Sequence, residues 1–364
     1  MFGAMVWLDA LAFALVCLAV LCSSFRSIYD AAVWKAGSPL RLGILGAARI
    51  APMALVRPAR AVPETTVLAV AARDPARAAA FARRQGIPRV HRGYDDLIAD
   101  PEIDAVYNPL PNNLHAEWSI RALGAGKHVL CEKPLASNAD EAVRMAEAAR
   151  ASGRVLMEAF HWRYHPLAAR MREIVASGEL GAIRHVEASM CIPMLRPGDI
   201  RYRLDLAGGA AMDVGCYAVS IVRFLAGAEP EVVGAEARCS SPGVDRWISA
   251  ALRFPDGRTG RVTGSLLSWP LLRIEARVEG ERGTLHVVNP AVPQFYHWLT
   301  VRTAAGRRRE RVPGEATYTY QLRAFAAAVR DGTPVPTDAE HGVRNMRVID
   351  AMYRAAGLAP RGTS

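Results

Sequence analysis

Titratable side chains follow two neighbouring strands that the sequence predicts at residues 105–108 and 128–131. The first strand leads into Asn108 to His115, and the second into Glu132-Lys133-Pro134. Ligands bind at the carboxyl ends of the strands in an open parallel sheet, so we expect both segments to line one binding site. Lys133 is one of only three lysines among 45 basic residues. Lysine has a displaceable proton and a pKa that shifts on burial, which arginine lacks, so we favour a functional lysine over a surface one.

A second motif precedes these segments, where a strand at 40–45 meets a helix predicted at 48–61. Glycine at such a turn lets the backbone approach a pyrophosphate, and the helix N-terminus supplies free N–H groups. Gly46 holds the first position of the dinucleotide fingerprint, while Ala48 and Ala51 replace its later glycines. A tight turn without a ligand would look similar, but the following βαβ pattern favours a cofactor. We therefore expect Gly46, Ala48, Arg49 and Ile50 to bind the cofactor.

The coenzyme choice depends on the end of the next strand, predicted at 65–72. An acidic residue there binds the ribose of NAD, whereas an arginine accommodates the phosphate of NADP. Arg73 lies at the strand tip and Asp74 follows it. Asp74 also suits the N-cap of the helix predicted at 75–85. We therefore expect NADP, with Arg73 as its phosphate ligand; if Asp74 turned inward instead, NAD would be favoured.

The second half of the chain carries another candidate pair. Two glycines, Gly208 and Gly209, open a predicted helix that contains Asp213 and Tyr217. Residues four apart lie on one helical face, so these side chains share a surface. A plain structural interpretation also exists, in which Asp213 favours the helix dipole and Tyr217 packs in the core.

The elements that hold these residues divide into two predicted domains. Strands and helices alternate over residues 40–159, which predicts βαβ units and a parallel sheet. Strands then dominate from 183 to 288, and helices at 320–330 and 340–356 close the chain. The predicted fold class is α/β, with a Rossmann dinucleotide-binding domain over 37–160. A C-terminal domain with a large, mostly antiparallel open sheet spans 161–364.

Several of these segments resemble the glucose–fructose oxidoreductase, inositol dehydrogenase and rhizopine-catabolism (Gfo/Idh/MocA) family. The Glu132-Lys133-Pro134 triplet in AGKHVLCEKPLA is the most specific of them. LPNNLHAEW, MEAFHWRYHP and the closing QLRAFAAAVRDG…NMRVIDAMYRAAG also agree. The resemblance covers residues 40–358. It implies a nicotinamide cofactor, oxidation of sugars, polyols or related diols, and a sheet face that often forms an oligomer interface, so we expect a homo-oligomer (dimer or tetramer).

The resemblance also assigns roles to residues. It makes Lys133 catalytic and places the acid–base pair at Asp213 and Tyr217, where the Lys133 ammonium is expected to favour the Tyr217 phenolate. Many branches have histidine at the position of Tyr217. Tyrosine is similar to the aldose dehydrogenase, glucose–fructose oxidoreductase and dihydrodiol dehydrogenase branches, and disfavours inositol dehydrogenase and NAD-dependent glycosidase activity. Further cofactor contacts are expected at Leu110, Pro111, Asn112, His115, Glu132 and Lys133.

On the substrate side we expect Arg163, His165 and Tyr202. His161 stands where the family more often has an apolar residue, and we expect it to alter specificity. The predicted function is NADP-dependent hydride transfer to or from an aldose C1 or a diol carbinol. Two alternatives stay open: redox-assisted glycosidase or epimerase chemistry, and a non-catalytic nucleotide-binding regulator.

Composition excludes several other classes. Hydrophobic residues make up 51% and the formal net charge is +10. The basicity is almost entirely arginine and no nucleic-acid motif accompanies it, so we expect no nucleic-acid partner. We interpret the densest basic run, at 306–311, as a solvated turn between strands. The six cysteines form no C-x-x-C pair, so neither a disulfide framework nor a metal site is expected, and a cytoplasmic location follows.

The N-terminal 36 residues form a separate hydrophobic segment. Residues 4–22 carry a single charge, Asp9, which makes a membrane span marginal. A signal peptide requires a positive charge before its apolar run, and none precedes Asp9. An anchor, a cleaved signal and a start assigned too far upstream all remain open. Membrane contact is expected only if residues 4–22 are retained.

Overall fold

The computed structural model describes residues 38–363, apart from residues 197, 268 and 270. The segment 1–36 and its apolar run lie outside the described residues, so the three alternatives for them stay predictions. Within the described residues, one helical stretch has the length and apolar composition of a membrane span. Of the most apolar 18 residues in this stretch, Leu204–Ala226, 89% are buried inside the molecule, as in the core helix of a folded domain.

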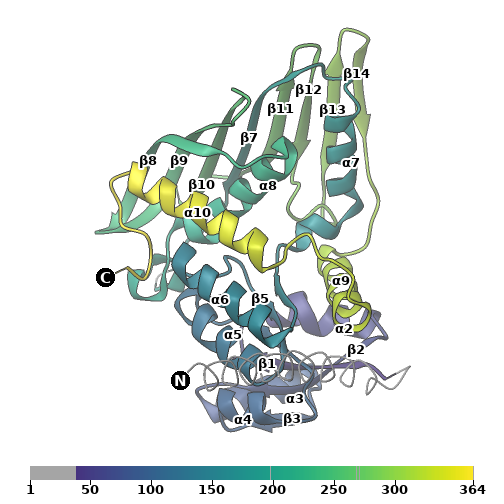
Figure 1. The fold of residues 1–364 in the computed structure, drawn as a ribbon, viewed down its shortest axis with the longest axis vertical. Helices are drawn as coiled ribbons and strands as arrows, with labels where there is room; N and C mark the ends of the chain where they lie inside the picture. The colour runs from purple at the N-terminus through teal and green to yellow at the C-terminus, as the bar shows by residue number, and fades with distance from the viewer. Residues whose placement is uncertain (1–37, 197, 268, 270, 364) are drawn as a thin grey trace, which may run out of the picture.

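The first layer is a six-stranded parallel sheet with the order β3-β2-β1-β4-β5-β6. Its strands are β1 (Leu40–Leu45), β2 (Thr65–Ala71), β3 (Arg89–His91), β4 (Ala105–Asn108), β5 (His128–Cys131) and β6 (Leu156–Glu158). The connecting helices are α3 (Pro75–Gln85), α4 (Tyr94–Ala99), α5 (His115–Gly124) and α6 (Ala139–Ser152) (Figure 1). The strand order reverses between β1 and β4, which is where such sheets bind nucleotides. The predicted Rossmann domain is confirmed.

The helix expected at 48–61 is irregular. It begins as a π-helical turn, η1 (Pro52–Val56), and continues as the short helix α2 (Arg57–Ala61). Pro52 and Pro58 each lack the N–H group that a regular i→i−4 ladder needs. The wider turn is therefore the local consequence of two prolines in one helix.

The second layer is an eight-stranded sheet with the order β14-β13-β12-β11-β7-β10-β9-β8. Its strands are β7 (Ile183–Cys191), β8 (Glu231–Ser241), β9 (Val244–Arg253), β10 (Thr259–Ser265), β11 (Arg273–Gly280), β12 (Gly283–Val288), β13 (Trp298–Thr303) and β14 (Gly306–Glu310). All pairs are antiparallel except β7 with β10. The predicted open, mostly antiparallel sheet is confirmed.

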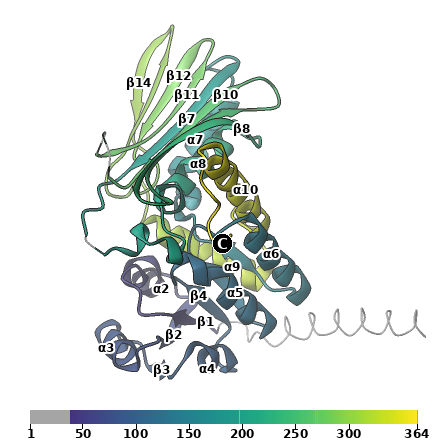
Figure 2. The same cartoon turned by 90° about the vertical axis from the view of Figure 1, so that its left-hand side faces the viewer.

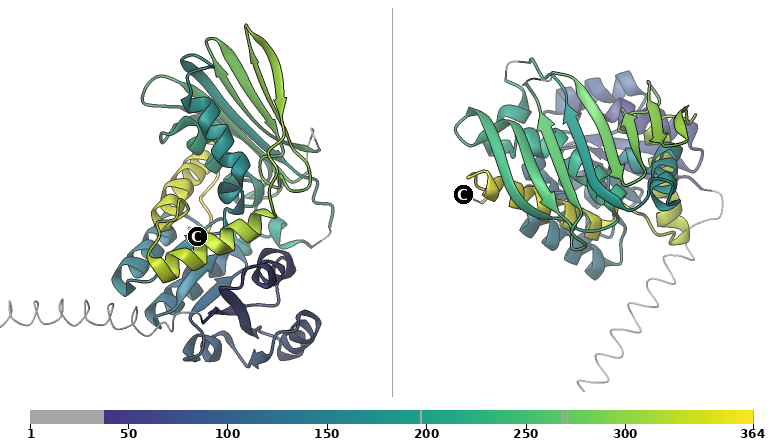
Figure 3. Two further views of the ribbon diagram at one scale, coloured as in Figure 1. Left: turned by 90° about the vertical axis from the view of Figure 1, so that its right-hand side faces the viewer. Right: turned by 90° about the horizontal axis from the view of Figure 1, so that it is seen from above.

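Helices cover one face of this second sheet. They are α7 (Pro166–Ala176), α8 (Cys216–Ala226) and α10 (Ala339–Ala355), which contact β12, β7 and β8 respectively. Val186, Ala188 and Met190 of β7 are buried, whereas Glu187 between them is not. This period of two matches a strand with one covered face. The opposite face is turned away from the Rossmann domain (Figures 2 and 3).

The basic run is an edge strand, so its interpretation as a turn was wrong. Residues Gly306–Glu310 pair with β13 and form β14. The Arg308 guanidinium lies 2.6 and 2.8 Å from the two Glu179 carboxylate oxygens, which neutralises the centre of the run. Charged side chains are a common way to protect an exposed sheet edge from pairing with another chain.

The last two helices return to the Rossmann domain. Helix α9 (Thr317–Asp331) packs on α2, and Leu322 and Phe325 of α9 are wholly buried in the core cluster that contains Leu42 and Tyr107. Helix α10 packs along α6 (Figure 1). The two sheets are therefore joined by shared packing and not only by the chain that passes between them.

Candidate active site

Two elements bring the candidate catalytic side chains together. Lys133 follows the carboxyl end of β5, and Asp213 lies in a π-helical turn, η6 (Ala211–Gly215), that opens α8. Tyr217 lies in the first turn of α8. The approach to η6 requires glycine, because a Cβ on Gly209 would lie 2.0 Å from an Asp245 carboxylate oxygen, at a φ of +136°. Gly209, one of the two glycines at the start of the predicted helix, is therefore needed for the close packing of that start against Asp245.

Lys133 is the centre of the cluster. Its Nζ donates to the Asp213 backbone carbonyl at 2.8 Å and lies 3.3 Å from the Asp213 carboxylate. The same ammonium lies 5.0 Å from the centroid of the Tyr217 ring. Arg201 joins from η4 (Ile200–Tyr202), with its Nε 2.7 Å from the second Asp213 carboxylate oxygen. The structure therefore brings the three predicted residues together and adds Arg201.

The Lys133–Asp213 pair is charged in the folded chain. Burial alone would lower the pKa of Lys133, but Asp213, Cys216 and Glu132 together outweigh it and raise that pKa. Burial alone would raise the pKa of Asp213, but Lys133 and Arg201 outweigh it and lower that pKa. Both directions favour an ammonium beside a carboxylate at neutral pH.

The environment of Tyr217 differs from the expectation. Burial, followed by the nearby Glu132, raises the pKa of Tyr217 well above its ordinary value. The Lys133 ammonium lies over the Tyr217 ring and makes its hydrogen bonds to Asp213, so its positive charge does not offset the effects that raise this pKa. The Tyr217 hydroxyl instead lies 3.0 Å from Nε2 of His161, in η3 (His161–Tyr164).

Glu132 is held behind Lys133 and makes two hydrogen bonds. Its carboxylate accepts from the Tyr107 hydroxyl at 2.6 Å and from the Lys133 backbone N–H at 3.3 Å. Burial raises the pKa of Glu132, against the opposing effect of Lys133. Glu132 thus connects Tyr107 of β4 to the backbone of Lys133.

The phosphate-binding turn has the shape that a dinucleotide needs. Gly46 adopts a φ of +90°, and a Cβ there would meet Leu110 at 2.9 Å. Only glycine leaves the backbone open at such a position. Ala48 and Ile50 follow in the same turn, between β1 and η1. The residues of this turn fit a bound nicotinamide dinucleotide.

The neighbouring loop is fixed by His115. Its Nε2 lies 2.8 Å from the Leu110 carbonyl and its Nδ1 lies 2.8 Å from the Pro134 carbonyl. Burial lowers the pKa of His115 to about 4. His115 therefore joins the loop after β4 to the Lys133-Pro134 segment, while Pro111 begins the 3-10 turn η2 (Asn112–Leu114).

Two contacts cross from the cofactor side to the substrate side. Asn112 donates from Nδ2 to the Ala207 carbonyl at 3.0 Å. Arg49 lies 3.7 Å from the buried carboxylate of Asp199, which also pairs with Arg201. Arg49 and Asn112 thus link the predicted cofactor loops to the segment that precedes η6.

At the tip of β2, Asp74 is engaged as an N-cap. Its side chain accepts from the backbone N–H groups of Ala76 and Arg77 at 2.9 and 3.2 Å. Arg73 and Arg77 are both exposed, and Arg77 donates to the Ala47 carbonyl of the phosphate-binding turn at 3.1 Å. Asp74 does not turn inward as NAD would require, and two arginines lie where the ribose end of a dinucleotide would be bound.

The three substrate-side candidates make mostly structural contacts. The Arg163 guanidinium lies 3.8 Å from the Phe224 ring centroid. Nδ1 of His165 caps α7 by accepting from Leu167 N–H at 3.0 Å. Tyr202 donates its hydroxyl to the Met194 carbonyl at 2.9 Å. Each of the three residues thus makes a structural contact, while Nε of Arg163 and Nε2 of His165 are buried without a hydrogen-bond partner among the described residues.

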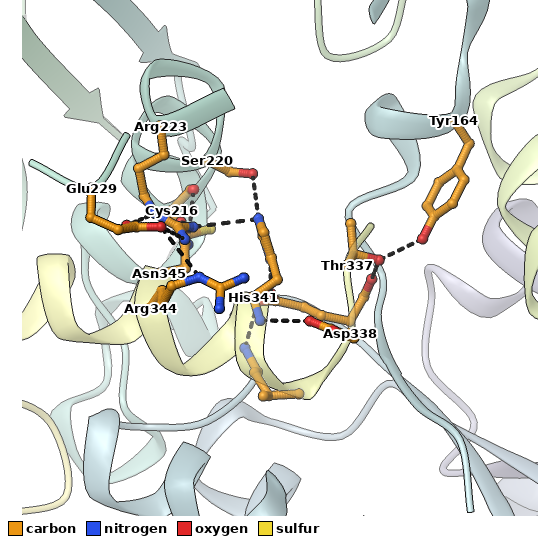
Figure 4. Close-up of polar contacts among 12 residues, drawn as sticks. Tyr164, Cys216, Ser220, Arg223, Glu229, Thr337, Asp338, His341, Arg344 and Asn345 are labelled. Carbon is orange, nitrogen blue, oxygen red and sulfur yellow. Dashed lines mark hydrogen bonds and ion pairs between the residues drawn. The ribbon is translucent and has the colours of Figure 1, made fainter. Parts of the chain in front are cut away.

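A buried polar network supports both catalytic segments from behind. Glu158 accepts from the Leu135 backbone N–H at 2.9 Å and lies 3.2 Å from Nδ1 of His341. Nε2 of His341 faces Ser220 and Arg223 of α8 (Figure 4). One chain of contacts therefore joins the segment after Lys133 to the helix that carries Tyr217.

Sequence reasoning missed Thr317 and Arg77, and it did not predict that Arg201 pairs with Asp213. The polar link from His161 to Tyr217 extends to Thr317, whose Oγ1 lies 2.8 Å from His161 Nδ1. Arg77 could have been found, because it lies one helical turn after Arg73. The link to Thr317 had no local signal, since 156 residues separate it from His161.

The fold and this site define an NAD(P)-binding oxidoreductase. Residues 40–160 match the oxidoreductase family model with an NAD-binding Rossmann fold, and residues 168–286 match the GFO/IDH/MocA C-terminal domain. The chain belongs to the Gfo/Idh/MocA oxidoreductase family, which confirms the resemblance seen in its motifs.

Two of its relatives are named for a sugar and for a diol. The D-xylose 1-dehydrogenase (NADP(+)) 2 of Haloferax volcanii is 40% identical over 321 residues, which cover 87% of this chain and 97% of the relative. The trans-1,2-dihydrobenzene-1,2-diol dehydrogenase of Sus scrofa is 34% identical, covering 62% of this chain and 67% of the relative.

Solved structures agree with this assignment. The 3-ketoreductase KijD10 of Actinomadura kijaniata, in complex with NADP and TDP-benzene, has a TM-score of 0.82 and 34% identity, covering 87% of this chain and 98% of that one. The aldose-aldose oxidoreductase of Caulobacter crescentus has a TM-score of 0.81 and 27% identity, covering 88% and 98%. The chain is an NAD(P)-dependent oxidoreductase of this family.

Proposed function

We propose that this chain is an NADP-dependent dehydrogenase that oxidises the C1 hydroxyl of an aldose or the carbinol of a diol. The observation that carries this proposal is the convergence of Lys133, Asp213 and Tyr217 in a chain that also has the phosphate-binding turn at Gly46. The choice of NADP is supported by the engagement of Asp74 as a helix cap, which leaves Arg73 and Arg77 for the 2′-phosphate. The relatives named for xylose and for dihydrodiols support the substrate class.

The turn from Gly46 to Ile50, with Arg73 and Arg77, would hold a nicotinamide dinucleotide, which would supply the hydride acceptor for the substrate carbinol carbon. Tyr217 takes the hydroxyl proton on its phenolic oxygen in oxidation and returns it to the carbonyl oxygen in reduction. Lys133 donates a hydrogen bond to the reacting oxygen with its remaining N–H group and favours negative charge there. Asp213 fixes the Lys133 ammonium, and Arg201 fixes Asp213.

The test follows nicotinamide absorbance with purified protein and a panel of aldoses, polyols and trans-dihydrodiols, first with NADP and then with NAD. We expect NADP reduction by one sugar or diol class. Tyr217→Phe should reduce kcat about 100- to 10,000-fold, as loss of a general acid–base group does, and leave NADP binding intact. Full turnover by Tyr217→Phe would refute the assignment. Bound cofactor with no net reduction would favour redox-assisted glycosidase or epimerase chemistry instead.

A further inference from the structure

His161 is a buried polar side chain that the reaction as proposed does not yet use. It is 2% exposed and lies between α9 and α8. Its Nε2 faces the Tyr217 hydroxyl at 3.0 Å, and its Nδ1 faces the Thr317 hydroxyl at 2.8 Å. Its ring stacks on Tyr318, with centroids 4.0 Å apart. Three neighbours thus hold the imidazole in one place.

The imidazole is neutral. Burial, with a smaller effect from the Lys133 ammonium, lowers the pKa of His161 to about 3. A neutral imidazole has one N–H donor and one acceptor nitrogen. The hydrogen bonds to Thr317 and Tyr217 therefore run in a single sense through the ring.

The Thr317 hydroxyl sets this sense. Thr317 is wholly buried, and its hydroxyl has no hydrogen-bond partner other than His161 among the described residues. A buried O–H donor left without an acceptor is costly, so this hydroxyl donates to Nδ1. The proton of the ring then lies on Nε2, and it points at the Tyr217 oxygen.

We propose that His161 is a positioning residue for Tyr217: as the Nε2–H tautomer it donates to the phenolic oxygen. The proposal rests on the acid–base role of Tyr217 proposed above. The Tyr217 O–H is then free to point at the substrate, since its oxygen is already an acceptor. In oxidation the Tyr217 phenolate takes the hydroxyl proton of the carbinol, and the C–H hydrogen of the carbinol leaves as hydride for the nicotinamide acceptor. In reduction the Tyr217 O–H group gives its proton to the carbonyl oxygen of the substrate. His161 neither gains nor loses a proton.

This donor matters because the surroundings of Tyr217 oppose its ionised form. The titratable or charged groups that act on Tyr217 come from several elements: Glu132, Lys133, Glu158, Asp213, Cys216, Tyr107, Tyr318 and His161. Most of them are acidic and disfavour the phenolate, and two of the three Lys133 N–H groups are used on Asp213. An N–H group at hydrogen-bond distance of the phenolic oxygen is therefore the direct stabilisation that the structure offers.

Two variants separate the contact to Tyr217 from the contact to Thr317. In His161→Gln the amide nitrogen reaches the place of Nε2 and can still donate to Tyr217. In His161→Asn the amide reaches only the place of Nδ1, so it meets Thr317 and stops short of Tyr217. We expect kcat to fall about 10- to 100-fold in His161→Asn with KM little changed, and to recover most of this loss in His161→Gln.

The pH profile adds a readout that a packing defect would not give. The limb of the kcat profile that reports Tyr217 ionisation should move to higher pH by about one unit or more in His161→Asn, and by less in His161→Gln. NADPH binding, followed by fluorescence, checks that both variants fold. Equal kcat and an unmoved limb in His161→Asn would overturn the proposal.

A second measurement needs no turnover. In protein labelled with ¹³C and ¹⁵N histidine, the His161 ring signals, identified by their loss in His161→Asn, should report the Nε2–H tautomer. The Nδ1–H tautomer would overturn the proposal, whatever the substrate panel gives. If no substrate is turned over, the function proposed above fails while this spectrum still decides the state of His161.

Discussion

Coenzyme choice is decided at the scale of single residues, by the two arginines at the tip of β2 and the start of α3. The charges of Arg73 and Arg77 both act to lower the pKa of Tyr94, against the effect of burial. The two guanidinium groups therefore lie in one region beside the phosphate-binding turn. A phosphate held by guanidinium groups forms short, charge-assisted hydrogen bonds. The carboxylate that follows Arg73, that of Asp74, is engaged with the backbone of α3.

Removing either arginine should therefore weaken NADP selectively. Each hydrogen bond to a charged group contributes about 1.5–3 kcal/mol, so Arg73→Ala or Arg77→Ala should raise KM for NADP about 10- to 100-fold. KM for NAD should change little. Arg83→Ala, an exposed arginine in the last turn of the same helix, is the matched control and should behave as the parent. An equal loss for both coenzymes would contradict a 2′-phosphate role.

At the scale of elements, the C-terminal tail fastens the start of the catalytic helix. Arg361 is 2% exposed, and it pairs with the buried Asp245 and donates to the Gly208 carbonyl at 2.7 Å. Asp245 in turn accepts from the Ala211 backbone N–H at 2.7 Å. The tail thus holds the glycine pair and the first residue of η6, two residues before Asp213.

Breaking this pair should cost more than removing it. Arg361→Met leaves the Asp245 carboxylate buried without its cation, and such a loss costs about 3–5 kcal/mol. The double variant Asp245→Asn/Arg361→Met removes the charge and keeps an oxygen for the Ala211 N–H, so it should be the more stable of the two. Denaturant unfolding measures both. Equal stabilities would mean that the pair is not the source of the loss.

Most elements could be predicted because their local patterns are strong. The α3 helix has an Asp74 cap at its start and a left-handed Gly86 at its end, and its predicted bounds match the structure. The prediction failed at β14, where Arg307 to Glu310 lack the apolar alternation of a strand. An edge strand with charged side chains is held by pairing with β13, which local composition does not report.

The site divides in the same way. Lys133 could be found because lysine is rare in this chain and because it lies in a family motif. Asp213 and Tyr217 could be found because glycines open the helix that carries them. The contacts of Arg163, His165 and Tyr202 could not, because they depend on the packing of η3, α7 and the loop before η4. The raised pKa of Tyr217 also needed the structure, since it arises from burial among acidic groups of β6, η6, α8 and the loop after β5.

At the scale of the whole molecule, the chain completes its first domain only at its end. Helix α9 seats Thr317 and Tyr318 against His161, and α10 places His341 beside Glu158. The folded chain also buries several histidines, and the stability of the protein in acid depends on their pKa values. Burial lowers the pKa of His115 and His165 to about 4 and that of His161 to about 3.

These histidines should make the protein more stable as the pH rises from about 4.5 to 6.5. In this range the unfolded chain holds protons on them that the folded chain does not, so unfolding takes up protons. Asp245 and Asp350 act in the opposite direction, because burial raises the pKa of each to about 6 and the folded chain holds the extra proton. Three histidines outweigh two aspartates, and above pH 6 the effect of the aspartates fades as their carboxyls lose the proton in the folded chain as well.

Denaturant unfolding at pH 4.5, 5.5 and 6.5 measures the balance, and Asp350→Asn isolates its opposing part. The asparagine keeps an oxygen for the Ala139 N–H, which Asp350 now accepts at 3.0 Å, and removes the group whose protonation favours the folded state at low pH. The free energy of unfolding should therefore climb more steeply with pH in Asp350→Asn than in the parent chain. A parent stability that is flat or falls over this range would show that the buried histidines do not control acid unfolding.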